Sequence, residues 1–291
     1  MSPPSAPVAI AGAGRMGAAL GLLLRERGTP VVAIAGRDPG RTAEAAKFIG
    51  GAVRPVPYAQ LPAHATRILI AVPDDALESL AALLAESGMR KGVAIHTSGA
   101  RGPEALAALE TQGVSCAAMH PLQTVTTPRQ GLSALPGSAF GISGSGKALD
   151  WALEIVKLLE GQPLLIAPAM RPLYHAAAVM ASNYIVALID SAVILMGEAG
   201  VDPGDALRAL APLIRASAEN TLEAGPAAAL TGPIERGDTG TVLAHLQALV
   251  KSPETVRELY RRAGLHAAEM AQRKGSNRGK LKFLLHEGMS Q

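Results

Sequence analysis

The chain has 291 residues, of which 48% are hydrophobic and only 3% aromatic, and a formal net charge of +3. It is longer than one typical domain and can bury a large, mostly aliphatic core. The small charge and the scattered basic residues argue against nucleic-acid and membrane surfaces. One cysteine, Cys116, excludes an internal disulfide, and the first residues lack the basic and apolar parts of a signal peptide. We therefore expect a cytoplasmic protein.

The first predicted element is a short apolar strand, residues 8–11, which runs directly into a glycine turn and the first turn of a helix. This order is the dinucleotide-binding fingerprint. Gly12 allows the tight turn, Gly14 lets backbone N–H groups approach a pyrophosphate, and Gly17 lets helix and strand pack closely. The helix N-terminus favours the negative phosphates. The pattern predicts a cofactor site formed by Gly12, Gly14, Arg15, Met16 and Gly17. The alternative is a purely structural turn.

The second predicted strand, residues 30–35, indicates which dinucleotide binds. In an NAD site an Asp or Glu at the end of this strand binds the ribose hydroxyls. Here small residues stand in that place, followed by Arg37 and Arg41. Because guanidinium groups attract a 2′-phosphate, the sequence favours NADP(H). The alternative is that both arginines are solvated surface residues, and Asp38 between them is expected to be a turn or cap residue.

Strand-like and helical runs alternate as far as residue 167. Strands are predicted at residues 67–72, 93–97, 115–119, 139–142 and 163–167, with helices at 76–87 and 147–159. This alternation predicts an α/β fold with a doubly wound parallel sheet, the Rossmann arrangement. Cys116 falls in one of these strands and is expected to be buried rather than a nucleophile.

Ligands of such sheets lie at the carboxyl ends of the strands. Val72, Pro73 and Ser98 stand at the ends of two predicted strands, and we expect them to border the cofactor. His120 ends the next strand and is a candidate for contact with substrate or nicotinamide. The alternative is a turn role for Pro73 and Asp74, and stabilisation of the turn at Pro121 for His120.

After Pro168 the sequence predicts helices only. Asp202-Pro203 and Ser252-Pro253 each have the pattern of an N-cap followed by proline in the first helical position. The predicted domains are therefore a dinucleotide-binding domain at residues 1–168 and a helical domain at residues 169–291.

The segment 173–198 predicts a helix that is apolar almost all round, and hence central and buried. A membrane span is the competing interpretation, which polar residues within the run argue against. His175, Ser182, Asn183 and Asp190 fall on one stripe, within an arc of about 100°. A polar stripe on an apolar helix commonly faces a cleft. The alternatives are a satisfied core histidine for His175 and an interhelical hydrogen bond for Asn183.

Several short sequences together resemble one family. They are Val72-Pro73-Asp74, His96-Thr97-Ser98-Gly99, His120-Pro121-Leu122-Gln123-Thr124, Ala181-Ser182-Asn183-Tyr184, and Gly232 to Asp238 with Thr241 and His245. Members of that family pair a Rossmann-like domain with a helical C-terminal domain of unknown function, and are usually described as NADP-dependent oxidoreductases. The layout is also similar to the 6-phosphogluconate dehydrogenase superfamily, which includes ketopantoate reductases and pyrroline-5-carboxylate reductases.

The resemblance implies roles for four residues. Related hydroxyacid and ketopantoate enzymes have a lysine at the start of the long helix and an asparagine one or two turns later, where this chain has His175 and Asn183. Histidine can supply a proton at neutral pH, so His175 is expected to be the general acid and Asn183 to orient the substrate. Arg236 is expected to hold a carboxylate, with a salt bridge as the alternative. His120 completes the expected site.

The expected function is reduction of a small 2-oxo acid, ketopantoate-like acids first, by NADPH in a homodimer joined through the helical domain. The alternatives are an imine or pyrroline carboxylate substrate, and a non-catalytic NADP(H)-binding regulator, which the missing lysine suggests. A deazaflavin as redox partner is a further alternative. The seven histidines are dispersed without an HxxxH pair, so no metal site is expected.

Overall fold

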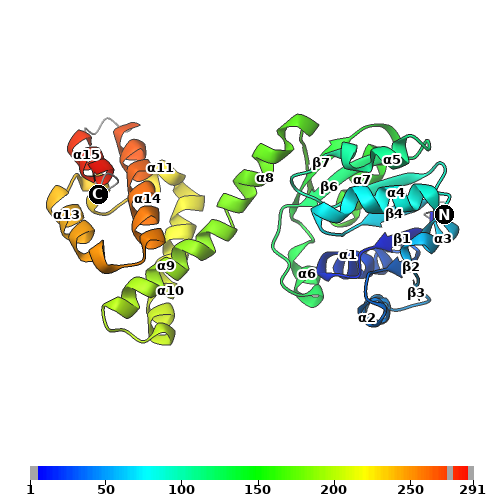
Figure 1. Ribbon diagram of the computed structural model, residues 1–291, viewed down its shortest axis with the longest axis horizontal. Helices are drawn as coiled ribbons and strands as arrows, with labels where there is room; N and C mark the ends of the chain where they lie inside the picture. The colour runs from blue at the N-terminus through cyan, green and yellow to red at the C-terminus, as the bar shows by residue number, and fades with distance from the viewer. Residues whose placement is uncertain (1–5, 274–277, 288–291) are drawn as a thin grey trace. The chain divides into compact units, whose positions relative to one another are not determined.

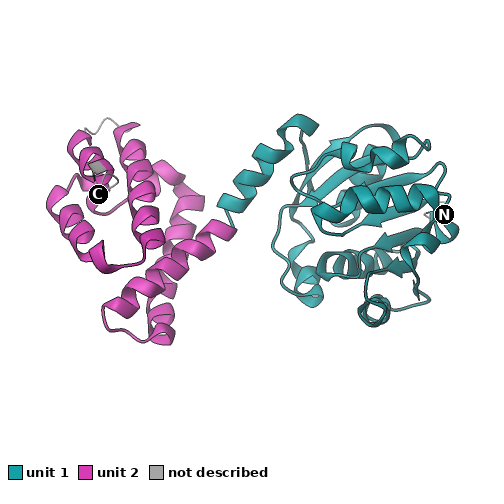
Figure 2. Cartoon of the chain, in the orientation of Figure 1, with its two compact units in different colours: residues 1–182 teal, residues 183–291 magenta. Residues whose placement is uncertain are grey.

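A computed structural model describes residues 6–273 and 278–287. The chain divides into two compact units, residues 1–182 and 183–291 (Figure 2). The first unit contains all the described strands, as Figure 1 shows. The change from strands to helices after residue 168, expected from the sequence, thus falls inside the first unit, which also includes the helix at 171–180.

The elements of the first unit follow in chain order. They are β1 (Val8–Ala11), α1 (Arg15–Glu26), β2 (Val31–Ala35), α2 (Pro39–Ile49), β3 (Arg54–Pro55), η1 (Tyr58–Gln60), α3 (Leu61–His64), β4 (Arg67–Ile70), η2 (Asp74–Ala76), α4 (Leu77–Glu86), β5 (Val93–His96), η3 (Pro103–Leu106), α5 (Ala107–Glu110), β6 (Ser115–Pro121), α6 (Pro128–Ala134), β7 (Ala139–Gly144), α7 (Gly146–Leu158), β8 (Gln162–Leu165), η4 (Pro168–Met170) and α8 (Arg171–Met180).

The strands form one eight-stranded sheet in the order β3-β2-β1-β4-β5-β6-β7-β8. All neighbouring pairs are parallel except β6 and β7. The predicted α/β class with a doubly wound, Rossmann-like sheet is confirmed. The antiparallel β7 and the two-residue strand β3 were not predicted, because an apolar run shows that a strand exists but not its direction.

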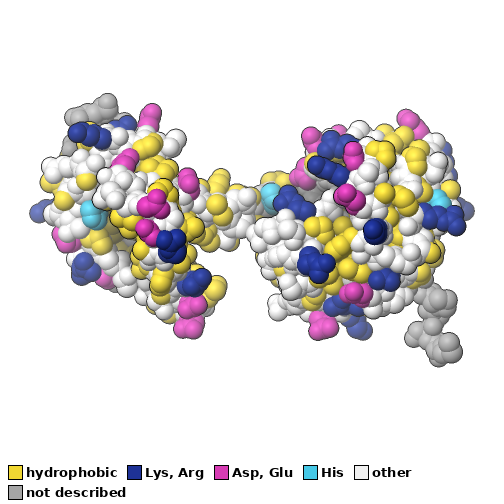
Figure 3. Space-filling model, turned by 90° about the horizontal axis from the view of Figure 1, so that it is seen from below, with side chains coloured by type: hydrophobic (Ala, Val, Ile, Leu, Met, Phe, Trp, Pro, Cys, Tyr) yellow, Lys and Arg dark blue, Asp and Glu magenta, His cyan; other side chains and the backbone are white. Residues whose placement is uncertain are grey.

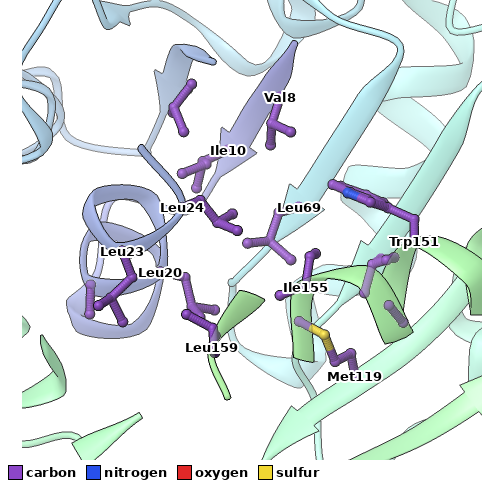
Figure 4. Packing of buried hydrophobic residues seen from close by; sticks show 14 of the residues in the cluster. Val8, Ile10, Leu20, Leu23, Leu24, Leu69, Met119, Trp151, Ile155 and Leu159 are labelled. Atoms are coloured by element: carbon purple, nitrogen blue, oxygen red, sulfur yellow. The ribbon is translucent and has the colours of Figure 1, made fainter. Parts of the chain in front are cut away.

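Both faces of the sheet are covered, as mainly parallel sheets require. Successive residues of a strand point to opposite faces, so Val8 and Ile10 join one core cluster while Ala9 and Ala11 join the other. The first cluster includes side chains from α1 and α7, and Figure 4 shows Leu24 and Trp151 among them. The second includes side chains from α3 and α4. This rigid core fixes the carboxyl edge of the sheet.

The second unit is helical throughout its described part. Its elements are α9 (Asn183–Glu198), α10 (Pro203–Ala224), α11 (Pro226–Ala229), α12 (Pro233–Arg236), α13 (Thr239–Ala248), η5 (Leu249–Lys251), α14 (Glu254–Arg273) and α15 (Gly279–Glu287).

Two helix starts in this unit are set by aspartates. Asp202 caps α10 as predicted, because its Oδ1 accepts the backbone N–H of Gly204 at 2.9 Å. Asp238 caps α13 in the same way, through the N–H of Thr241 at 3.0 Å. Ser252 differs, since its hydroxyl donates to Glu198.

The predicted central helix at 173–198 is wrong in two respects. Residues 181 and 182 form a turn that separates α8 from α9, and α9 contains no buried residue. Leu173 is 71% exposed and Val186 67% exposed. The prediction failed because apolar composition alone does not determine whether a helix is buried. Figure 3 shows hydrophobic side chains at the surface of both units.

By length and composition alone, Pro168–Glu198 is also apolar enough to cross a membrane, and it is the one such segment among the described residues. A single candidate of this kind is weak evidence for a membrane protein.

Candidate functional site

The glycine turn after β1 has the geometry that the sequence predicts. Gly12 has a φ of +123°, and a Cβ there would lie 2.2 Å from the carbonyl oxygen of Ala71. A Cβ at Gly17 would lie 2.0 Å from the carbonyl oxygen of Gly12. A Cβ at Gly14 would meet nothing within 4 Å. Gly12 and Gly17 are therefore required by close packing, whereas Gly14 borders open space.

The start of α1 offers donors to that space. Gly14 is the N-cap and supplies no side-chain hydrogen bond, and the first turn contains no acidic residue. Gly14 and Arg15 are exposed, while Met16 packs partly buried against the core. The first backbone N–H groups of a helix lack intrahelical partners, so this helix end can hold an anion such as a pyrophosphate.

The two predicted arginines follow the carboxyl end of β2, with Arg37 just before α2 and Arg41 in its first turn. Arg37 and Arg41 are both exposed. Asp38 caps α2 as predicted, since its Oδ1 accepts the backbone N–H of Arg41 at 2.7 Å. Burial raises the pKa of the Tyr58 phenol, and the positive charge of Arg37 opposes that shift. The end of β2 is thus a positively charged surface, with its aspartate used as a cap.

The strands β1, β2, β4, β5 and β6 are parallel, so their carboxyl ends lie along one edge of the sheet. Val72 and Pro73 follow β4, the first half-buried and the second exposed. Ser98 follows β5 and is 5% exposed. Its hydroxyl accepts the backbone N–H of Arg101 at 3.1 Å. Contact of these residues with a cofactor stays a prediction.

His96 ends β5 and is fully buried. Its Nδ1 accepts the backbone N–H of Ser98 at 3.2 Å, so the proton lies on Nε2, which donates to the carbonyl oxygen of Gly102 at 2.9 Å. Burial lowers the pKa of His96 to about 4. The neutral ring fixes the loop between β5 and η3.

Three rings meet at the same edge, and we call His120, Tyr174 and His175 the aromatic cluster. The Nδ1 of His120 and the hydroxyl of Tyr174 are 2.9 Å apart. The ring of His120 makes edge contacts with the rings of Tyr174 and His175, each with centroids 5.7 Å apart. Burial lowers the pKa of His120 to about 4, with smaller effects from His175 and Arg171. The predicted residues His120 and His175 are therefore neighbours.

Two glycines make room for the cluster. A Cβ at Gly99 would lie 2.2 Å from Cδ2 of His175 and 3.1 Å from Nε2 of His120. A Cβ at Gly141 would lie 2.5 Å from the hydroxyl oxygen of Tyr174. The rings of α8 thus lie directly against the backbone that follows β5 and the backbone of β7.

Arg171 attaches the start of α8 to this edge. The side chain is 0% exposed and donates to the carbonyl oxygens of Ser98 and Gly141 and to the hydroxyl of Ser143. Among the described residues no carboxylate pairs with it, and its Nε has no hydrogen-bond partner. Burial lowers its pKa. The site therefore contains a buried positive charge.

Sequence reasoning missed Arg171 and Tyr174. The available signal was an arginine and a tyrosine at the start of an otherwise apolar helix, three residues apart and therefore on one face. The other two predicted residues belong to the second unit, where Asn183 begins α9 and Arg236 ends α12. Both are exposed, and their roles stay predictions. Cys116 is buried in β6, as expected, and burial raises its pKa to about 12.

Comparison with protein families matches both parts of the chain. Residues 1–121 match a Rossmann-like domain, and residues 138–267 match a domain of unknown function, DUF2520. No curated protein is similar enough in sequence to count as a relative.

Solved structures resemble the chain over nearly its whole length. A candidate NADP oxidoreductase from Bacteroides fragilis has 21% identity and a TM-score of 0.74, covering 91% of this chain and 99% of its own. An imine reductase from a Pseudomonas species has 19% identity and a TM-score of 0.62, and the match covers 93% of this chain and 95% of the reductase. A pyrroline carboxylate reductase from Plasmodium falciparum, with NADP bound, has 15% identity and a TM-score of 0.59, covering 97% and 98%. At these identities the likeness shows a shared fold.

The family matches agree with the strand-end motifs from which the resemblance was first inferred. The N-terminal part of the chain is a Rossmann-like domain, and the part that follows it is similar to the domain of unknown function DUF2520.

Proposed function

We propose that this protein is an NADPH-dependent reductase that transfers a hydride to the C=O or C=N carbon of a small molecule. The observation that carries the proposal is that two features lie along one edge of the sheet. After β1 there is an open glycine turn followed by the N-terminus of α1, and at the end of β6 there is the aromatic cluster. NADPH, when bound, supplies the hydride. The chain must then bind both molecules and provide a proton.

The residues along this edge fit a phosphorylated dinucleotide. Gly14 and the first turn of α1 suit the pyrophosphate, and Arg37 and Arg41 at the end of β2 suit a 2′-phosphate. Since β2 and β4 lie on opposite sides of β1, a dinucleotide with its adenosine half at β2 extends toward β4 and β5. The nicotinamide half then runs toward Val72, Pro73 and Ser98.

The proton donor in this proposal belongs to the aromatic cluster, in which His175 is the candidate from the sequence. Negative charge develops on the acceptor atom during hydride transfer, so a nearby donor accelerates the step. Asn183 would orient the substrate carbonyl and Arg236 would hold a carboxylate. These two roles come from the family resemblance and from the chemistry of an amide and a guanidinium.

A small 2-oxo acid, with ketopantoate-like acids first, is the substrate class proposed from the sequence. The second class is an imine or pyrroline carboxylate, which the names of the similar imine reductase and pyrroline carboxylate reductase favour. Both classes have a polar double bond, C=O or C=N, that can lie next to a carboxylate. They differ in whether oxygen or nitrogen receives the proton.

We also propose that the protein acts as a homodimer in the cytoplasm, joined through its helical unit. Large apolar side chains on α9 and α10 support this arrangement, including Val186 at 67%, Leu213 at 64% and Leu222 at 86% exposure. Apolar surface of this kind usually marks an interface.

Turnover assays test the function. The purified protein, supplied with NADPH, should oxidise it in the presence of some member of a panel of 2-oxo acids, cyclic imines and pyrroline carboxylates, and NADH should serve less well. A regulator would instead bind NADPH tightly and leave every panel member unreduced. That result, or failure to bind NADPH at all, would contradict the proposal.

A further inference from the structure

The hydroxyl of Tyr174 is the most firmly held polar group in the aromatic cluster. It lies 2.9 Å from Nδ1 of His120. The absence of a Cβ at Gly141 lets that oxygen lie against the strand. A fixed position of this kind is what proton transfer in a transition state requires.

The hydrogen-bond inventory of a phenol leaves its proton available. A phenol oxygen has one hydrogen to donate and two lone pairs that accept. An Nδ1–H tautomer of His120 occupies one of these lone pairs. In that arrangement the O–H of Tyr174 is not directed at His120. It can then point at a substrate atom, and the Nδ1–H of His120 stabilises the phenolate that remains.

The electrostatic surroundings support this use of the phenol. Burial raises the pKa of Tyr174, which keeps the phenol protonated at neutral pH. The guanidinium of Arg171, 5.9 Å from the ring centroid, acts in the opposite direction and stabilises the anion. Arg171 carries no carboxylate partner among the described residues, so its charge is not neutralised by an ion pair. A positive charge beside a proton donor lowers the cost of releasing the proton.

His175 is less well suited to the same task. No hydrogen bond orients its ring within the described part of the chain, and its contact with His120 is an edge contact between rings. It lies against Gly99, where it can shape the surface that a substrate meets. His120 is hydrogen-bonded to the phenol through Nδ1, so in this inference it supports Tyr174 and does not itself donate to the substrate.

We infer that Tyr174, hydrogen-bonded to His120 and packed against Gly141 with Arg171 beside it, donates the proton that completes the reduction. This inference rests on the proposed reductase function. The substrate carbon gains a C–H bond from the hydride, and the electron pair of the C=O or C=N π bond takes the hydrogen of Tyr174 as that O–H bond breaks. NADPH is oxidised and the substrate reduced. The phenolate of Tyr174 recovers one proton from solvent through His120, so one hydride and one proton are consumed.

The variant Tyr174→Phe tests this assignment in the full-length protein with NADPH and the best substrate of the panel. Phenylalanine keeps the ring against Gly141 and removes only the hydroxyl, so the NADPH Kd should stay within about twofold of wild type and the thermal unfolding temperature within a few degrees. The expected result is a fall in kcat of about 100-fold or more, the usual contribution of a general acid. Without substrate, ultraviolet titration should show one late-ionising tyrosine fewer in the variant than in wild type, because burial raises the pKa of Tyr174 as it does those of Tyr58 and Tyr260.

Tyr260 provides a matched control, because its hydroxyl lies 2.8 Å from Nδ1 of His245 with the same edge-on ring geometry in the second unit. Tyr260→Phe should leave kcat unchanged. If Tyr174→Phe keeps kcat within about threefold while His175→Gln abolishes turnover, His175 is the donor and the inference is wrong although the function stands. If wild type reduces no panel member, the proposed function fails, and the inference fails with it. A variant that loses turnover together with NADPH binding also contradicts a specific proton-donating role.

Discussion

Two glycines at the carboxyl edge of the sheet, Gly12 and Gly14, have different roles. Gly12 is a packing requirement, since any side chain would overlap the carbonyl of Ala71 and its φ is +123°. Gly14, two residues later, is in contact with nothing that a methyl group would displace. A glycine that the fold does not need, at the N-cap of a helix, is best explained by a ligand that approaches the backbone.

Replacing each of these glycines with alanine separates stability from binding. Gly12→Ala should lower the free energy of unfolding by more than about 2 kcal/mol, through both the positive φ and the overlap with Ala71. Gly14→Ala should change it by only a few tenths of a kcal/mol, and should weaken NADPH binding about tenfold or more. Denaturant unfolding and calorimetry measure the two effects. Equal NADPH affinity in wild type and Gly14→Ala would show that no ligand approaches there.

Two histidines are held neutral by burial, and this has a consequence for stability. The pKa values of His96 and His120 are lowered to about 4, whereas an unfolded histidine titrates near 6.5. Between these values the unfolded chain binds more protons than the folded chain. The stabilisation is complete above pH 6.5 and is lost as the pH falls toward 4.

The free energy of unfolding should therefore decrease from about pH 6.5 to about pH 4 and be insensitive to these groups at higher pH. His96→Gln keeps a donor for the carbonyl of Gly102 but cannot take up a proton, so it should remove about half of this pH dependence. Urea unfolding of wild type and His96→Gln at a series of pH values measures this pH dependence. An unchanged slope in the variant would mean that His96 is not a titrating contributor.

At the scale of elements, the sequence predicted most of the first unit. Apolar runs between turn residues identified seven of the eight strands, because buried parallel strands are continuously apolar. The antiparallel direction of β7 and the break at residues 181 and 182 could not be predicted, since neither changes local hydrophobicity. Of the site, His120 and His175 were found through strand ends and a polar stripe. Tyr174 and Arg171 required the three-dimensional contact with Gly141.

The attachment of α8 to the sheet depends on Arg171. Its hydrogen bonds join the start of this helix to the backbone after β5 and to β7. Arg171→Met keeps the length of the side chain but leaves the carbonyls of Ser98 and Gly141 without their donor, at a cost of about 3 kcal/mol in unfolding free energy. Hydrogen exchange should also show faster opening of α8. Wild-type stability and exchange in this variant would rule out an anchoring role.

At the scale of the whole molecule, the exposed apolar residues of the helical unit require an explanation. Val186 on α9 and Leu213 on α10 are each more than 60% exposed. One exposed apolar residue is ordinary, but several on consecutive helices suggest a covered surface. A second copy of the chain is the proposed cover.

Light scattering tests this prediction. Wild type should have the mass of two chains, and the double variant Val186→Glu with Leu213→Glu should have the mass of one, because burying the added charges in an interface is costly. Leu83 on α4 of the first unit, 38% exposed, gives the matched control, and Leu83→Glu should remain dimeric. A monomeric wild type would contradict the dimer. A wild type that needs detergent to stay in solution would instead favour a membrane-associated helix.

The central claim is that the carboxyl edge of the first unit binds NADP(H) through the glycine turn and the arginines after β2. Calorimetric titration of the wild-type protein with NADPH and NADH tests it most directly. Arg37→Ala is the test variant, and Lys47→Ala, which removes an exposed positive charge near the end of α2, is the control. We predict saturable binding at one site per chain, NADPH preferred over NADH by about tenfold or more, a preference lost in Arg37→Ala and kept in Lys47→Ala. Absence of binding by either nucleotide, or equal affinity for both in wild type, would contradict the account.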